Sequence, residues 1–120
     1  MKEFSFEDLS EETKRKIQQL QIYEQNYQQL LIEKRALTIE KEEIENAMVE
    51  IEKTKNDVFK IIAGQFILKT EKDSLIEEIK NKKEIISLRI KNIEKQEKDY
   101  TEKTENIRKE IIEEINNIKI

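Results

Sequence analysis

Residues 58–70 constrain the fold more than any other part of the chain, because they alone do not follow a helical pattern. Their sequence reads VFKIIAGQFILKT. β-Branched and aromatic residues surround Gly64, the one glycine of the sequence, which falls where a tight turn requires positive φ. The pattern predicts a β-hairpin with strands at 58–62 and 66–70. An unbroken helix is the alternative, and the β-branched and aromatic content argues against it.

Apolar residues recur every seven positions on both sides of the predicted hairpin. Two such series, three residues apart, form the a and d positions of a coiled coil, so we expect helices over about 6–55 and about 71–118. In the first helix the series are Tyr23, Leu30, Leu37, Ile44, Ile51 and Val58, and Leu20, Tyr27, Lys34, Lys41, Met48 and Lys55. In the second helix they are Ile79, Ile86, Ile93, Tyr100 and Ile107, and Ile76, Lys83, Ile90, Glu97, Thr104, Ile111 and Ile118.

The expected fold class is mainly α, a long antiparallel two-helix coiled coil with one β-hairpin at the helix–helix connection. Charged residues make up 42% of the chain and proline is absent, which is typical of a coiled coil. Disorder is the alternative, and the regular apolar spacing disfavours it. Residues 1–120 then form a single domain, with helices of about 70–75 Å and both chain ends at one distal end. Paired residue numbers should sum to about 130, with the register known only to within a heptad, so Leu20 and Tyr23 should lie near Ile107 and Ile111.

Short polar residues mark the expected helix starts, since a hydroxyl three residues before a polar partner fits a capping box. The candidate pairs are Ser5 with Asp8 or Ser10 with Thr13 for the first helix, and Thr70 with Asp73 for the second.

Several classes of function are disfavoured by what the sequence lacks. It has no histidine, no cysteine and one glycine, so we expect no catalytic site, cofactor site, metal site or phosphate-binding loop. A net charge of −4 with interspersed signs disfavours nucleic-acid binding. No apolar run approaches the ~20 residues of a membrane span, and the acidic start is unlike a secretory signal. We therefore expect a cytoplasmic protein that acts through contacts with other chains.

Two apolar surfaces are the candidate contact sites. A two-stranded hairpin cannot bury its apolar faces alone, so the hairpin should drive assembly, and the apolar distal end should hold other chains. The distal residues could instead close the tip of the coiled coil, since Ile112 and Ile115 lie beside the heptad series. The assembly residues are Val58, Phe59, Ile61, Ile62, Gly64, Phe66, Ile67 and Leu68. The distal residues are Phe4, Phe6, Leu9, Leu20, Ile107, Ile111, Ile115 and Ile118.

The chain resembles the β-type subunit of archaeal prefoldin over roughly residues 15–110. The resemblance is carried by the single hairpin, by its junction with the second helix and by Gln-rich runs in the first helix. Its ends, with Phe4 and Phe6 at the start and isoleucines at the close, depart from the family pattern. The matching residues are Val58-Phe59-Lys60, Gly64, Ile67-Leu68-Lys69-Thr70, Lys72-Asp73, Ile76-Glu77-Glu78-Ile79, Leu88-Arg89-Ile90, Ile93-Glu94-Lys95-Gln96-Glu97, Gln18-Gln19-Leu20 and Gln28-Gln29-Leu30.

The resemblance implies a hexameric chaperone that works without ATP. Two α-type and four β-type subunits would join their hairpins into a double β-barrel, and the coiled-coil tips would capture unfolded proteins and pass them to a group II chaperonin. A structural adaptor that binds one folded partner through its hairpin is the alternative function.

Overall fold

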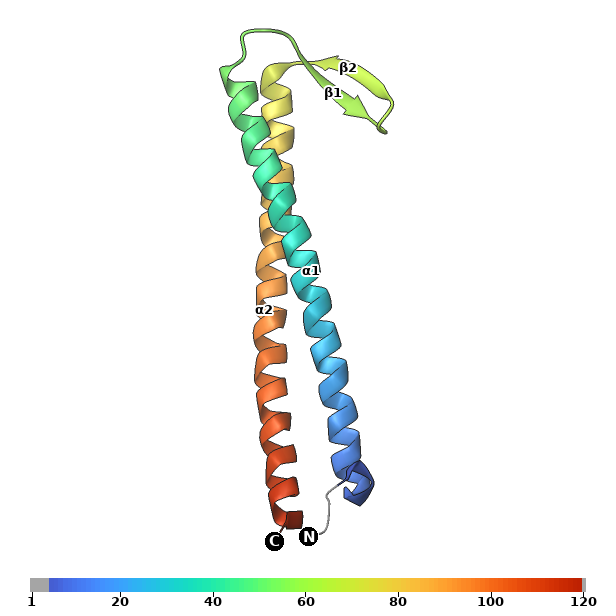
Figure 1. The fold of residues 1–120 in the computed structure, drawn as a ribbon. Helices are drawn as coiled ribbons and strands as arrows, with labels where there is room; N and C mark the ends of the chain where they lie inside the picture. The colour runs from blue at the N-terminus through green and yellow to red at the C-terminus, as the bar shows by residue number, and fades with distance from the viewer. Residues whose placement is uncertain (1–4, 120) are drawn as a thin grey trace. The chain divides into compact units, whose positions relative to one another are not determined.

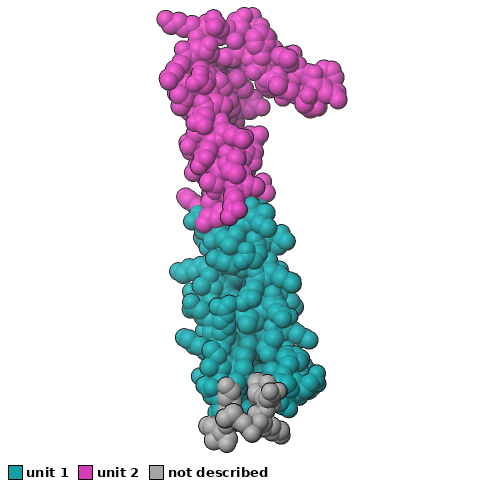
Figure 2. Space-filling view, in the orientation of Figure 1, with its two compact units in different colours: residues 1–33, 93–120 teal, residues 34–92 magenta. Residues whose placement is uncertain are grey.

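The computed structural model describes residues 5–119, and it confirms the predicted fold class of two long helices joined by one hairpin (Figure 1). Two compact units are present, residues 34–92 and residues 1–33 with 93–120 (Figure 2), and both long helices contribute to each unit. The elements are the 3₁₀ turn η1 (Phe6–Asp8), α1 (Glu11–Lys53), β1 (Val58–Ile62), β2 (Phe66–Thr70) and α2 (Lys72–Lys119). That residues 1–120 form a single domain stays a prediction.

The unit of residues 34–92 holds the hairpin and the helix segments that flank it. β1 and β2 pair antiparallel, with Ile61 opposite Ile67 and Ile62 opposite Phe66. Lys72, the first residue of α2, donates from Nζ to two backbone oxygens near the end of α1, those of Glu52 and Thr54, at 3.0 Å each. These carbonyls have no partner within the helix, so the ammonium group fastens the two helices beside the hairpin. The buried apolar residues of this unit are Leu37, Val58, Leu75 and Ile86.

In the other unit α1 and α2 again run antiparallel. The rings of Tyr23 and Tyr100 lie 5.8 Å apart, and Arg108 Nη2 donates to Glu24 Oε1 at 2.6 Å. These contacts agree with the predicted register to within one heptad, although Tyr23 meets Tyr100 and Lys103. The buried residues of this unit are Leu9, Thr13, Leu30, Ile93 and Ile111.

The predicted seam positions face the helix–helix interface. From Leu20 to Ile51 and from Ile76 to Ile111, every residue of the two heptad series is buried or half-buried. Lys34, Lys41 and Lys83 are half-buried in this way. This is expected for lysines whose methylene groups pack along a seam while the ammonium group stays in water. The heptad spacing therefore correctly predicted which face of each helix packs against the other helix.

The predicted helix starts are partly wrong. The first helix does not run from Phe6, because Leu9 is extended (φ −78°, ψ 150°) between η1 and α1. Both candidate N-terminal pairs form, one for each element. The Asp8 carboxylate accepts from the Ser5 N–H at 3.0 Å, and the Ser10 hydroxyl accepts from the Thr13 N–H at 3.1 Å. For the second helix, the strand pairing of Thr70 with Val58 continues β2 to that residue, so α2 begins two residues later, at Lys72.

Candidate functional site

The hairpin presents apolar side chains that the described part of the chain leaves uncovered. Successive strand residues point to opposite faces, so the run from Phe59 to Ile62 puts apolar groups on both faces. Val58 differs, since its side chain is buried within the subunit. Six of the predicted assembly residues are 44–73% exposed, namely Phe59, Ile61, Ile62, Phe66, Ile67 and Leu68.

One polar contact ties the hairpin to the helices. Lys60 on β1 lies 3.3 Å from Glu78 on α2, and Val58 shares its strand face because the two residues are two positions apart. This face of β1 is therefore the one directed toward α2. The opposite face, which carries Phe59, Ile61 and Ile67, has no such contact among the described residues, so it is the more open of the two.

A tight turn joins the strands. The Gln65 N–H donates to the Ile62 carbonyl at 3.2 Å, and φ is positive at both central residues, +54° at Ala63 and +68° at Gly64. Two successive positive φ values are the signature of the type I′ turn, which matches the twist of paired strands. A Cβ on Gly64 would meet no heavy atom within 4 Å, so its backbone conformation, and not space, requires glycine there.

Replacing Ala63 with asparagine should stabilise the hairpin. An alanine in the left-handed region is disfavoured by about 1 kcal/mol, whereas Asn-Gly is a favoured pair for this turn. We expect Ala63→Asn to raise the melting temperature of the assembled protein by a few degrees. Gly64→Ala is the comparison variant, because it places an alanine at the other residue with positive φ. It should lower the melting temperature by a similar amount. Equal melting temperatures for the two variants would contradict this turn geometry.

The structure separates the predicted distal residues by exposure. Phe6 and Ile118 are exposed, Leu9 and Ile111 are buried, and Phe4 lies outside the described residues. Three others, Leu20, Ile107 and Ile115, are half-buried. Ile112, which lies beside the heptad series, is among the most exposed apolar residues of α2. Contact of these residues with other proteins stays a prediction.

A polar cluster joins the two helices at the distal end, and the sequence analysis did not identify it. The Thr13 hydroxyl donates to a Glu114 oxygen, and Lys16 Nζ lies 2.5 Å from the other Glu114 oxygen and 3.5 Å from Glu110. The hydrogen bond to Glu114 raises the pKa of Lys16, against partial desolvation and with help from the charges of Glu114, Glu110 and Glu12. Lys16 is thus held in its charged form. Continuing the heptad series to 13, 16 and 114 was the signal that could have found this cluster.

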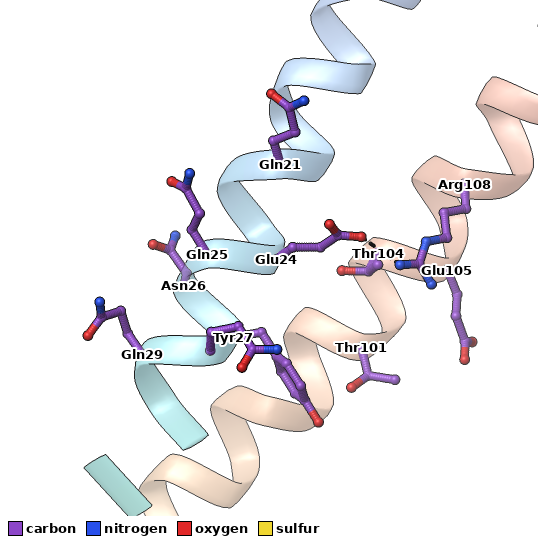
Figure 3. A pocket seen from close by; sticks show the side chains of 11 residues that line it. Gln21, Glu24, Gln25, Asn26, Tyr27, Gln29, Thr101, Thr104, Glu105 and Arg108 are labelled. Atoms are coloured by element: carbon purple, nitrogen blue, oxygen red, sulfur yellow. Dashed lines mark hydrogen bonds and ion pairs between the residues drawn. The ribbon is translucent and has the colours of Figure 1, made fainter. Parts of the chain in front are cut away.

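A shallow groove lies between α1 and α2 next to this cluster. Figure 3 shows Glu24 reaching across it to Arg108, while Gln21, Gln25 and Gln29 point away from α2. Polar side chains of both helices, together with Tyr27, line the groove. Within residues 5–119 no group of three or more His, Cys, Asp or Glu residues could hold a metal ion. Nor does any helix in the described part of the chain have the length and hydropathy to cross a bilayer.

Comparisons with known proteins agree with this architecture. The sequence profile of the family described as "Prefoldin subunit" matches residues 14–117. Prefoldin subunit beta of Pyrobaculum islandicum is 33% identical over 94 residues, which are 77% of this chain and 74% of that protein. Prefoldin subunit beta of Thermococcus onnurineus is 34% identical over 95 residues, covering 78% and 81%. The crystal structure of the prefoldin beta subunit from Thermococcus strain KS-1 superposes with a TM-score of 0.79 at 30% identity, covering 87% of this chain and 92% of that one.

The family profile spans both helices and the hairpin. The similar proteins are archaeal β subunits, and one of them has the same fold. The chain belongs to the prefoldin family of chaperones, as a β-type subunit.

Proposed function

We propose that this chain assembles through its hairpin with α-type prefoldin subunits and further copies of itself, as a hexamer of two α-type and four β-type subunits. Membership in the family means hetero-oligomeric assembly with other prefoldin subunits. The exposure of six hairpin side chains carries the proposal for the surface used. Burying one such side chain contributes about 1.5–3 kcal/mol to the free energy of association. A partner subunit that covers either face of the hairpin would bury several of these side chains.

The assembled complex captures non-native proteins at the distal ends of its coiled coils, without ATP or another cofactor, and passes them to a group II chaperonin. Exposed Phe6, Ile112 and Ile118 support a distal contact surface for unfolded chains, because exposed apolar patches mark interaction sites. Each tip binds weakly, and several tips together hold one client. The site of action is the cytoplasm, and the chain has no catalytic role.

An aggregation assay tests this function. The complex at stoichiometric amounts should slow light scattering by a guanidinium-denatured enzyme after dilution. Removing residues 1–15 and 108–120 should weaken the effect while the complex keeps its number of subunits. Scattering that is unchanged by the intact complex would exclude client capture. Collapse of the truncated protein to monomers would assign the chain ends to assembly. Tight binding to one folded protein with indifference to denatured ones would favour the adaptor function.

A further inference from the structure

The two helices meet at their distal end through polar seam residues as well as apolar ones. Thr13 and Lys16 extend the two heptad series of α1 backward by one repeat, and Glu114 extends the series of Ile107 forward by one. The hydrogen bonds run from the Ser10 hydroxyl to the Thr13 hydroxyl at 2.9 Å, from the Thr13 hydroxyl to Glu114, and from Lys16 to Glu114 at 2.5 Å. We call Ser10, Thr13, Lys16, Glu110 and Glu114 the tip latch.

Two predicted client-contact residues are buried beside this latch. Leu9 precedes Ser10 and is 7% exposed, and Ile111 lies one helical turn before Glu114 and is also 7% exposed. Thr13 itself is 1% exposed. A client cannot reach Leu9 or Ile111 while Thr13 and Glu114 hold the helix ends together.

The seam next to the latch contributes little apolar packing. Residues 14–29 of α1 and 94–110 of α2 include no buried side chain. Seam residues such as Leu20 and Ile107 are only half-buried there. Polar and aromatic contacts, such as the Glu24–Arg108 ion pair and the tilted Tyr23–Tyr100 pair, also join the helices. Well-packed seams begin again at Leu30 and Ile93. The tip can therefore separate without disrupting a large apolar core, and coiled-coil regions with few buried contacts open most easily.

We propose that the tip latch is a reversible closure that covers Leu9 and Ile111, and that its opening exposes them to clients. This inference rests on the proposed capture of non-native proteins at the distal end, and it adds a closed state of that same site. The latch includes an ion pair whose side chains keep some contact with water, 23% exposed at Lys16 and 27% at Glu114, so salt weakens it. Separation of the helix ends should therefore increase with ionic strength. Separation of helix ends held only by an apolar seam should not.

Hydrogen exchange tests the closure without any client. In the assembled complex, Glu114→Ala should accelerate amide exchange at residues 13–20 and 107–116 by about tenfold, because it removes the acceptor for both Thr13 and Lys16. Glu113→Ala is the control, since it deletes a neighbouring exposed carboxylate of the same helix with the same gain in helix propensity. Equal exchange in the two variants would overturn the latch. So would exchange in the unmodified complex that does not rise between low and high salt.

Locking the latch tests its effect on capture. The chain has no cysteine, so a short bifunctional thiol reagent can join Thr13→Cys to Glu114→Cys specifically through a reducible link. The locked complex should lose at least about half of its ability to slow aggregation of the denatured enzyme, and reduction should restore it. Equal protection by the locked and reduced forms would overturn a closure that controls access. If neither form nor the unmodified complex protects, the proposed client capture fails, and the exchange experiment decides the latch separately.

Discussion

Ile61→Lys should dissociate the assembly into free subunits while the helices remain intact. Ile61 is 69% exposed and pairs with Ile67, which is 73% exposed, on the hairpin face opposite the one that carries Lys60. A partner that buries Ile61 gains about 1.5–3 kcal/mol from that side chain, and a lysine there must also be desolvated. The dissociation constant should therefore rise by at least roughly 100-fold. Native mass measurement at micromolar concentration reads this directly, and the circular dichroism of the helices should stay unchanged.

Ile39→Lys is the matched control for this result. Ile39 lies on the outer face of α1 and is half-exposed, so the same change in charge and size occurs away from the hairpin. The Ile39→Lys complex should keep its mass. An intact complex with Ile61→Lys, or dissociation by both variants, would show that assembly does not depend on the exposed hairpin face.

The hairpin and the seam were predictable because each follows from short-range pattern. Strands at residues 58–62 and 66–70 follow from β-branched and aromatic residues around a glycine, and the structure has both strands with these bounds. The inward faces of the helices follow from the heptad spacing, which Leu30, Leu37, Ile86 and Ile93 occupy as buried residues. Neither inference requires knowledge of distant contacts.

The helix starts were harder to predict because two capping signals lie close together. Ser5 and Ser10 each cap an element, and the extended Leu9 between them breaks what the apolar spacing predicts as one helix. The same break buries Leu9, whose position outside a helix no heptad pattern describes. The burial of Leu9 could not be predicted from the sequence for this reason.

The tip latch was missed because polar seam residues carry no hydrophobic signal. Thr13 and Glu114 are 101 residues apart in sequence, and their contact depends on a register that heptads fix only to within seven residues. The wider isoleucine pattern near the C-terminus suggested an apolar closure. The structure places Ile112 outward and Glu114 inward across from Thr13, beside the buried Leu9 and Ile111. Hydrogen bonds and charge therefore join the distal ends together with apolar burial.

Ile86→Ala should cause one of the largest losses of stability among alanine substitutions in the helices. Ile86 is 3% exposed at a seam position of α2. Removing a buried isoleucine to alanine typically lowers the free energy of unfolding by about 2–5 kcal/mol, because it deletes apolar contacts and leaves a cavity. For a chain of this size the melting temperature should fall by roughly 10 °C. Thermal unfolding of the assembled complex, followed by far-ultraviolet circular dichroism, measures the change.

The neighbouring residue makes this prediction selective. Ile85 is 58% exposed, and Ile85→Ala deletes the same atoms with the same gain in helix propensity. Its effect on the free energy of unfolding should stay within about 0.5 kcal/mol. The difference between the two variants therefore isolates burial at the seam from every other consequence of replacing isoleucine by alanine. If Ile85→Ala were as destabilising as Ile86→Ala, the helix face packed in the seam would be rotated from the one described, and the heptad assignment of α2 would have to move by one residue.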